Sequence, residues 1–171
     1  MKKLILALMV VATAGFASAQ SKVGHVNSQK LLDTLASRKA AIVELKKFEE
    51  NGYKELQEMQ KDLEASYAKY DATSANLSPV IQKIEQEKIM KKEQALQERQ
   101  QSLQQEMQIY SSELNKPILE RVQKAVDIVA ERKKLNYIID ESVTLYFKGG
   151  TDCTAEVMTE LLLLDAASMK K

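Results

Sequence analysis

Apolar and small residues recur at intervals of three and four between residues 37 and 70, and charged residues fill most of the positions between them. They are Ile42, Leu45, Phe48, Gly52, Leu56, Met59, Leu63, Tyr67 and Tyr70. Side chains three and four apart lie on the same side of an α-helix. The spacing therefore predicts one long helix with a single apolar stripe between two solvated faces.

A polar break separates this stripe from a second one. The residues "DATSAN" follow Tyr70, and then Ser78 can cap a new helix while Pro79 suits its first position. The second stripe keeps heptad spacing with polar residues at Glu93 and Gln100; its apolar members are Ile89, Leu96, Leu103, Met107, Tyr110 and Leu114. Two helices of similar length predict an antiparallel hairpin with its tip near residues 71–79. One uninterrupted helix is the alternative, and the proline and the polar break argue against it.

Both ends of the chain differ from the helical middle. The segments "KVGHVN" and "LNYIIDESVTLYF" are short and rich in β-branched and aromatic residues, which predicts strands. In the second segment, Val143, Leu145 and Phe147 alternate with more polar residues until Gly149 and Gly150, as expected for a strand with two unlike faces.

Two further signals lie between and after these segments. Pro117 is expected to kink the helix or to restart it, because proline lacks the N–H that an interior turn requires. Asp152 or Thr154 is expected to cap a closing helix. The apolar residues of this helix are Val157, Met158, Leu161 and Leu162.

These elements predict two parts. Residues 20–40 and 115–171 form a small body that contains the strands, and the helical arm of residues 41–114 is inserted between them. A few short strands leave unpaired edges that invite pairing with other copies, so the body is interpreted as an oligomerisation body.

The first residues predict export. Lys2 and Lys3 precede an apolar run from Leu4 to Ala14, and Ala17-Ser18-Ala19 has the small residues of a cleavage site. The apolar run is shorter than the roughly 20 residues that span a bilayer, which argues against a membrane anchor. A cleaved signal peptide is therefore predicted for residues 1–19.

Charge and composition exclude several classes of function. Without Lys2 and Lys3, 23 of the 25 basic residues remain against 24 acidic ones, so no bulk attraction to nucleic acid is expected. The single cysteine, Cys153, leaves no internal disulfide, and the single histidine, His25, is far from it in sequence. No catalytic pair, metal site or cofactor site is predicted, and the protein is not expected to be an enzyme.

The order of these motifs resembles the Skp (OmpH-like) family of periplasmic chaperones. The resemblance covers the chain after the signal peptide and is most specific at two places. The first is the strand and Asn turn of Val23 to Asn27, which leads into a helix. The second comprises the "YIID" strand, the second strand with Tyr146, and the start of the last helix at Asp152 to Val157.

The resemblance implies an α+β, predominantly helical fold, in which a long antiparallel coiled-coil hairpin is inserted into a small β-strand body that trimerises. It implies a periplasmic holdase that acts without ATP, and its partners are unfolded outer-membrane β-barrel proteins and two further copies of the chain. The strand residues expected in the trimer body are Val23, His25, Val26, Tyr137, Ile138, Ile139, Val143, Leu145 and Phe147. His25 stands where the family generally has an aliphatic residue.

A holdase needs weak contacts with many apolar segments, and flexible methionine and aromatic side chains suit such promiscuous surfaces. Met59 and Met107 belong to the stripes and are expected to pack the hairpin seam. The residues expected to contact unfolded clients are Tyr53, Tyr67, Tyr70 and Met90. Gly52 is interpreted as a possible hinge that would let the arms spread, because glycine in a helix costs about 1 kcal/mol relative to alanine.

Two alternatives stay open. Lipopolysaccharide or a membrane surface could be a partner, but acidic residues interrupt the only basic clusters, "KIMKKEQ" and "ERKK". A structural coiled-coil protein that tethers or spaces parts of the cell envelope would show the same helical pattern. Such a tether should bind one folded partner, whereas a chaperone should bind several unrelated unfolded chains.

Overall fold

The computed structural model describes residues 22–169, so the predicted signal peptide lies outside the described residues. The elements are β1 (Val23–Val26), α2 (Ser28–Thr34), α3 (Ala36–Thr73), the 3-10 turn η1 (Ser74–Asn76), α4 (Pro79–Lys133), β2 (Tyr137–Asp140), the 3-10 turn η2 (Glu141–Val143), β3 (Thr151–Asp152) and α5 (Thr154–Ser168). Two compact units are present. The body comprises the described residues up to Ala36 and from Leu119 onward, and the hairpin comprises Ser37–Ile118.

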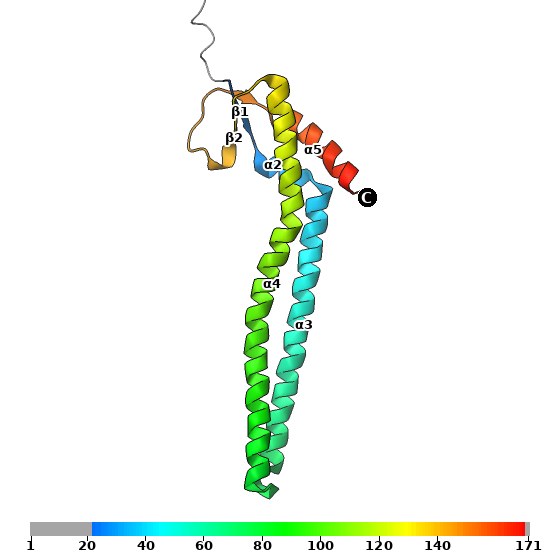
Figure 1. The fold of residues 1–171 in the computed structure, drawn as a ribbon, viewed down its shortest axis with the longest axis vertical. Helices are drawn as coiled ribbons and strands as arrows, with labels where there is room; N and C mark the ends of the chain where they lie inside the picture. Colours follow the sequence, from blue (N-terminus) through cyan, green and yellow to red (C-terminus); the bar gives the residue numbers. More distant parts are fainter. Residues whose placement is uncertain (1–21, 170–171) are drawn as a thin grey trace, which may run out of the picture. The chain divides into compact units, whose positions relative to one another are not determined.

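The hairpin consists of α3 and the first part of α4, which run antiparallel (Figure 1). Contacts between the helices show this direction: Tyr110 of α4 bonds to Glu44, whereas Glu93, nearer the start of α4, bonds to Tyr67. Pro79 begins α4 as the sequence predicts, and the backbone carbonyl of Ser78 accepts a hydrogen bond from the Gln82 N–H at 2.9 Å. The 38 residues of α3 correspond to a length of about 57 Å at 1.5 Å per residue.

The apolar seam follows both stripes with two exceptions. Leu63, Ile89 and Leu96 form a buried cluster, on which Leu56, Met59 and Tyr70 pack. Ile42 and Tyr67 were expected on the stripe, but both are exposed. A straight α-helix has 3.6 residues per turn and drifts relative to a regular apolar repeat, which accounts for the exposure of Ile42 at the end of the stripe. Tyr67 lies inside the stripe, and its hydroxyl bonds at the surface to Glu93 of α4.

Gly52 has a packing role inside α3. It is buried, and a Cβ atom built on it would lie 2.3 Å from Cδ1 of Leu103, which is itself buried on α4. The helix continues through this position without interruption. The hinge stays a prediction, and the close approach of the two helices accounts independently for glycine at this position.

Of the two alternatives for Pro117, the restart is wrong, because α4 continues through this residue to Lys133, and the kink stays a prediction. The missing N–H of Pro117 removes one bond to the carbonyl of Glu113. Glu113 and Pro117 are both exposed, so water can satisfy that carbonyl and the helix need not end. Instead, α4 ends where Lys134 adopts a left-handed conformation with φ 53°.

The body contains a three-stranded parallel sheet in the order β2-β1-β3. Val23 is opposite Tyr137 and Val26 is opposite Asp140, while His25 is opposite both Ile139 and Asp152. Parallel neighbours require a long crossover, and between β1 and β2 that crossover contains the entire hairpin. The predicted fold, a hairpin inserted into a small strand body, is therefore confirmed, and trimerisation stays a prediction.

The core of the body lies between the sheet and its helices. Asn27 caps α2 by accepting a bond from the N–H of Lys30, and Thr154 Oγ1 accepts one from the N–H of Asn27. Cys153 is fully buried, and burial raises the pKa of its thiol. The buried apolar residues of the body are Val26, Leu31, Leu35, Ala125, Val129, Cys153, Val157 and Leu161.

The strand predicted for Val143 to Phe147 is wrong. Asp140 ends β2 because its side chain accepts bonds from the N–H and the hydroxyl of Ser142, which close the turn η2. Such local side-chain bonds compete with strand pairing. The chain then continues without regular structure, and Leu145 is fully exposed. The third strand is instead β3, which follows two glycines of positive φ, Gly149 and Gly150.

The closing helix α5 is confirmed, but its cap differs from both expectations. Cys153 occupies the capping position without a side-chain bond, and Thr154 is the first helical residue. Asp152 still serves the helix end, because its carboxylate accepts a bond from the N–H of Thr154 at 2.9 Å. Within residues 22–169, no helix combines the length and the apolar character needed to cross a bilayer.

Candidate functional site

Tyr53 lies on the hairpin surface beside two hollows. Its side chain is 57% exposed, and it lines two neighbouring hollows of about 610 and 410 Å³. Gln104 and Met107 line both of them, so apolar atoms and amide groups are mixed around Tyr53. An exposed aromatic ring beside a shallow apolar hollow can cover a client side chain without imposing one orientation on it.

Met90 marks a third hollow, on the first part of α4. It is 63% exposed and lines a space of about 570 Å³. The apolar part of the lining comes from Leu63 and Leu96, which are seam residues, while Glu93 and three glutamines supply polar groups. Met90 thus extends the buried seam outward to the surface, and its flexible thioether can adapt to different apolar groups.

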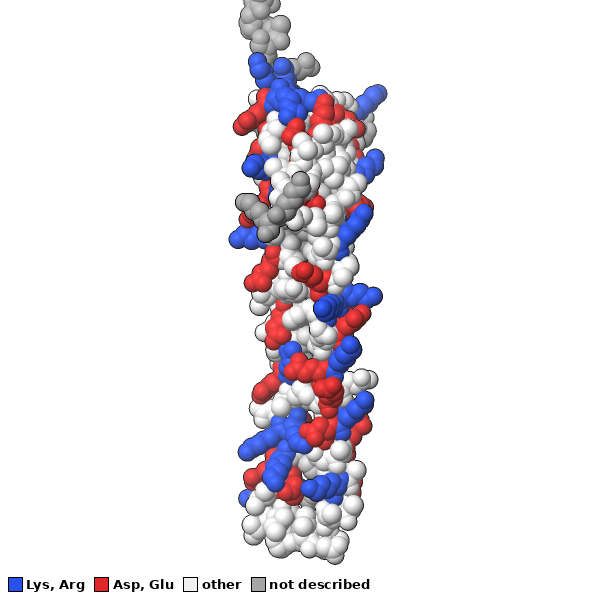
Figure 2. All heavy atoms as spheres, turned by 90° about the vertical axis from the view of Figure 1, so that its right-hand side faces the viewer, with Lys and Arg blue, Asp and Glu red and all other residues white. Residues whose placement is uncertain are grey.

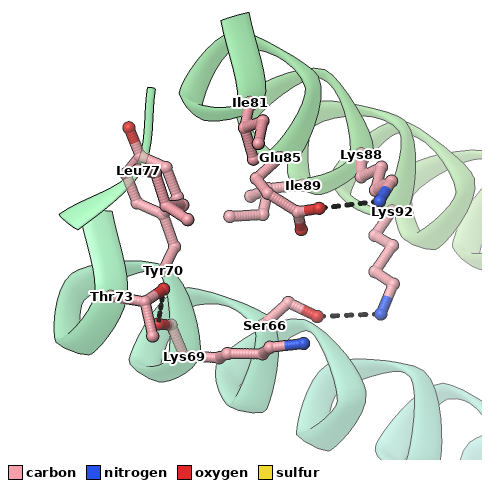
Figure 3. A pocket seen from close by; sticks show the side chains of 10 residues that line it. All are labelled: Ser66, Lys69, Tyr70, Thr73, Leu77, Ile81, Glu85, Lys88, Ile89 and Lys92. Atoms are coloured by element: carbon pink, nitrogen blue, oxygen red, sulfur yellow. Dashed lines mark hydrogen bonds and ion pairs between the residues drawn. The ribbon is translucent and has the colours of Figure 1, made fainter. Parts of the chain in front are cut away.

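The other two predicted contact residues are held by polar side chains. The hydroxyl of Tyr67 donates a hydrogen bond to Glu93, which raises the pKa of the phenol above its ordinary value. The hydroxyl of Tyr70 accepts a bond from Gln86 at 2.8 Å, and its ring lines a fourth hollow near the tip (Figure 3). The Tyr67 side chain is therefore less available for contact with another chain than the sequence suggests, whereas the ring of Tyr70 lines a cavity.

Charged side chains of both signs are mixed along the hairpin, and its tip is mostly uncharged (Figure 2). Several oppositely charged residues pair between the helices: Arg99 contacts Glu55 at 2.9 Å, and Lys92 contacts Asp62 at 2.6 Å. The hydrogen bond to Glu55 raises the pKa of Arg99. These pairs fix the register of α3 against α4 more than they create a field that would attract a charged partner.

The two basic clusters are both paired with acids. In the first, Lys88 contacts Glu85 at 2.7 Å and Lys92 contacts Asp62. In the second, Arg132 contacts Glu160 at 2.5 Å and Lys133 contacts Glu156 at 2.7 Å. Pairing with acids lowers the positive potential that the protein would need to bind an anionic membrane surface. Binding to lipopolysaccharide or to a membrane surface stays a prediction.

The strand residues predicted for the oligomer body separate into two groups. Val26 is buried within its own chain, and Val23, His25 and Ile138 are partly buried. The second group is exposed and comprises Tyr137, Ile139, Val143, Leu145 and Phe147, with Tyr146 beside them. Since β2 has β1 on one side only, its other edge is unpaired within the described chain. The exposed apolar residues therefore lie on or directly after an open sheet edge.

His25 has partners that the sequence did not indicate. Its Nδ1 lies 2.7 Å from Oε1 of Glu141, and its ring centroid lies 4.8 Å from that of Phe147. One ligand atom each from His25, Glu141 and Asp152 fall within 4.8 Å of one another, so these residues could hold a metal ion. We assign none, because the carboxylates already accept bonds from Asn27 Nδ2 and from the N–H of Thr154. No signal in the sequence joins His25 to Glu141, because the parallel pairing of β1 with β2 brings together residues 116 apart.

Sequence reasoning missed several exposed apolar residues of the hairpin. Five stand outside the two stripes: Val80, Ile81, Ile84, Ile109 and Val43. The first three lie within five residues of Pro79 at the start of α4. This group of apolar residues outside the stripe was the sequence signal that could have indicated exposed apolar surface near the tip. They add to the apolar surface near the tip, beside the hollow that Tyr70 lines.

Comparison with known proteins gives consistent matches over nearly the whole chain. Residues 22–161 match the family described as Outer membrane protein (OmpH-like). The chaperone protein Skp of Photorhabdus laumondii subsp. laumondii is 27% identical over 165 residues, which cover 94% of this chain and 99% of that protein. The chaperone protein Skp of Pectobacterium atrosepticum is 25% identical over 154 residues, which cover 90% and 93%.

A solved structure shows the same fold. It is described as an outer membrane chaperone (OmpH-like) from Caulobacter crescentus CB15, and it matches with a TM-score of 0.72 at 18% identity. The match covers 88% of each chain. The hairpin and the strand body therefore occur together in another protein of dissimilar sequence.

Proposed function

Because the chain belongs to the OmpH-like outer membrane protein family, whose relatives include Skp chaperones, we propose that it is a periplasmic holdase. In this proposal it binds unfolded outer-membrane β-barrel proteins without ATP and encloses them between helical arms, which prevents their aggregation. The signal-like residues 1–19 support export, and the family is one of chaperones rather than enzymes.

The observation that carries the proposal is the alternation of apolar hollows and paired charges along the hairpin. Tyr53 and Met90 expose apolar surface at separate hollows. Charged residues of both signs are spread along the hairpin as a whole (Figure 2). Each hollow offers weak, adaptable contact, and the paired charges keep the arm soluble. Several weak sites in sequence suit a long unfolded chain better than one defined partner.

The arms act together in the proposed assembly, which is a homotrimer held by the body. Support comes from the unpaired edge of β2 and from the exposed apolar segment of residues 143–147. In a single chain the side chains of this segment are exposed, whereas packing against neighbouring copies would bury them. The number three rests on the family resemblance.

The proposed client binding is tested with an unfolded outer-membrane barrel that contains tryptophan. This chain contains no tryptophan, so tryptophan emission reports on the client alone. When the urea-unfolded barrel is diluted into buffer, we expect the protein to suppress light scattering and to change the client emission. No change is expected when the barrel is already folded. Unchanged aggregation at every ratio of protein to client would contradict the holdase function.

The hollows are tested by the double variant Tyr53→Ser/Met90→Gln. Each substitution removes apolar contact worth about 1 kcal/mol, so we expect the apparent Kd for the client to rise about thirtyfold in the double variant. Val43 is also exposed and apolar on the hairpin but lines none of the four hollows, which makes Val43→Ser the control. An equal loss in the control would show that any exposed apolar residue serves and that the hollows have no particular role.

The assembly is tested by Leu145→Asp. A carboxylate in a buried interface between copies costs several kcal/mol, so we expect sedimentation velocity to show loss of trimer at micromolar concentration. Val43→Asp places the same charge on the hairpin and should leave the trimer intact. A wild-type monomer at that concentration would contradict the trimer itself, and an unaffected Leu145→Asp trimer would place the interface elsewhere.

The envelope tether is the second candidate function. It predicts that the protein binds one folded envelope component with saturable one-to-one stoichiometry and does not suppress aggregation of unfolded barrels. The dilution experiment above separates the two functions, because a tether leaves both scattering and client emission unchanged.

A further inference from the structure

The hollow near the hairpin tip, which we call the tip pocket, differs from the other three in its chemistry. It has a volume of about 350 Å³ and lies between the end of α3 and the start of α4. This is near the lower end of the roughly 300–1,000 Å³ typical of ligand pockets. Its lining residues are Ser66, Lys69, Tyr70, Thr73, Leu77, Ile81, Glu85, Lys88, Ile89 and Lys92.

Apolar side chains form one side of the tip pocket. Ile89 is buried in the seam, Tyr70 and Leu77 are partly buried, and Ile81 remains 45% exposed (Figure 3). The bond from Gln86 to the hydroxyl of Tyr70 holds the ring in place. Ile81 therefore leaves apolar surface uncovered at the mouth, and one large apolar side chain would bury it.

Three lysines form the other side, and Glu85 is the one carboxylate among the described lining residues. Lys88 contacts Glu85, and Lys92 contacts Asp62 and donates to Ser66 at 2.8 Å. Lys69 lies alongside Ser66 in Figure 3, on the α3 side of the pocket, and has no ion pair among residues 22–169. The bond from Lys88, together with the charges of Lys69 and Lys92, holds the pKa of Glu85 below its ordinary value. The pocket thus carries a surplus of positive charge beside an apolar wall.

We propose that the tip pocket binds the C-terminal residue of an unfolded client, with its apolar side chain against Tyr70 and Ile81 and its terminal carboxylate at Lys69. The proposal rests on the holdase function and names a recognition element within it. Capture of a terminal carboxylate is a recurrent mode of peptide recognition.

The chain end is favoured over an internal segment for a geometric reason. In an extended chain, neighbouring side chains point to opposite faces, so an apolar residue and the acidic residue next to it cannot enter one small pocket together. A terminal residue carries its carboxylate on the same Cα as its side chain. The volume suits one side chain with its carboxylate rather than a long acyl chain.

The test uses three fluorescein-labelled ten-residue peptides that share a Gly-Ser sequence. One ends in Phe with a free carboxylate, one ends in Phe amide, and one has an internal Phe-Ser-Asp with an amidated end. Fluorescence anisotropy is measured with the full-length protein at low and moderate salt. We expect the free acid to bind at least fivefold more tightly than either of the other two peptides, with the difference shrinking as salt rises.

The matched variants are Lys69→Gln and Lys83→Gln. Both lysines are exposed near the tip, but Lys83 does not line the pocket. We expect Lys69→Gln to abolish the preference for the free acid and Lys83→Gln to retain it, while helix content stays unchanged in both. Equal binding of the acid and the amide would overturn the proposal, as would equal effects of the two variants or equal binding of the internal peptide.

Two further measurements separate the remaining explanations. If octanoate competes for the site but the three peptides bind alike, the pocket recognises a free fatty acid and the proposal is overturned. The aggregation assay is run on the same samples. If the protein suppresses aggregation but does not distinguish the three peptides, the proposal for the tip pocket is refuted and the holdase function is not. Failure of the wild-type protein to suppress aggregation refutes the holdase function on which the pocket rests.

Discussion

Arg121→Met is expected to lower the free energy of unfolding by about 3–5 kcal/mol, because it leaves the carboxylate of Asp165 buried without this cation. Asp165 is only 2% exposed in the body, and its Oδ1 lies 3.3 Å from the guanidinium of Arg121. Asp165 also lies near the end of α5, where the negative end of the helix dipole disfavours a carboxylate. Urea unfolding followed by circular dichroism, at equal chain concentrations, measures the effect.

A second substitution and a control identify the cause. Arg121→Met/Asp165→Leu removes both charges, so most of the lost stability should return. Arg132→Met makes the same change further along α4, where the arginine pairs with Glu160 but is 57% exposed. It should cost less than about 1 kcal/mol. Equal losses for the two single variants would show that the buried carboxylate does not govern the result.

Leu103→Ala is expected to lower the free energy of unfolding by about 2–5 kcal/mol, the usual cost of a cavity in a core. Leu103 is buried in the hairpin and stands directly over Gly52. Gly52→Ala has two opposing effects. Alanine favours the helix by about 1 kcal/mol, but its Cβ would displace Leu103 at a cost of about 1–3 kcal/mol. We therefore expect a small net loss rather than a gain.

The double variant Gly52→Ala/Leu103→Ala distinguishes packing from helix propensity. The new methyl group would occupy part of the space that Leu103 leaves. The loss of stability in the double variant should therefore be smaller than the sum of the two single losses by about 1 kcal/mol or more. The same urea unfolding experiment provides all four free energies. If Gly52→Ala stabilises the hairpin as propensity alone requires, Leu103 does not restrict this position.

The hairpin could be predicted from the sequence because its physics is local. Spacing of three and four residues selected the buried seam members Leu63, Ile89 and Leu96, and Pro79 marked the start of α4. Ile42 lies near the start of α3 and is exposed. Its exposure depends on the drift of the helix and on where α3 loses contact with α4, and the spacing of apolar residues specifies neither.

The body was harder because its contacts join distant residues. The alternation from Val143 to Phe147 satisfies a strand pattern, but Asp140 and Ser142 close a turn first. The contact of His25 with Glu141 depends on the parallel register, which no local pattern encodes. Pro117 shows the opposite failure, since a strong local breaker is tolerated where the freed carbonyl can face water.

The candidate site was predicted in part. The positions of Tyr53 and Met90 off the stripes follow from spacing, and the structure places hollows at both. The tip pocket could not be predicted from the sequence, because its lining includes Lys69 of α3 and Ile81 of α4, which lie on either side of the polar break between the two stripes. Their approach depends on how the turn η1 closes, which neither stripe determines.

The parallel sheet also sets the order in which the chain can fold. β1 is made first, but both strands that pair with it lie more than 100 residues later. The two arm helices need only each other and can form while the C-terminal residues are still missing, whereas the body must wait for the end of the chain. A chain on the ribosome therefore has no sheet until residue 137 and those after it have been made, because neither strand that pairs with β1 is present before then.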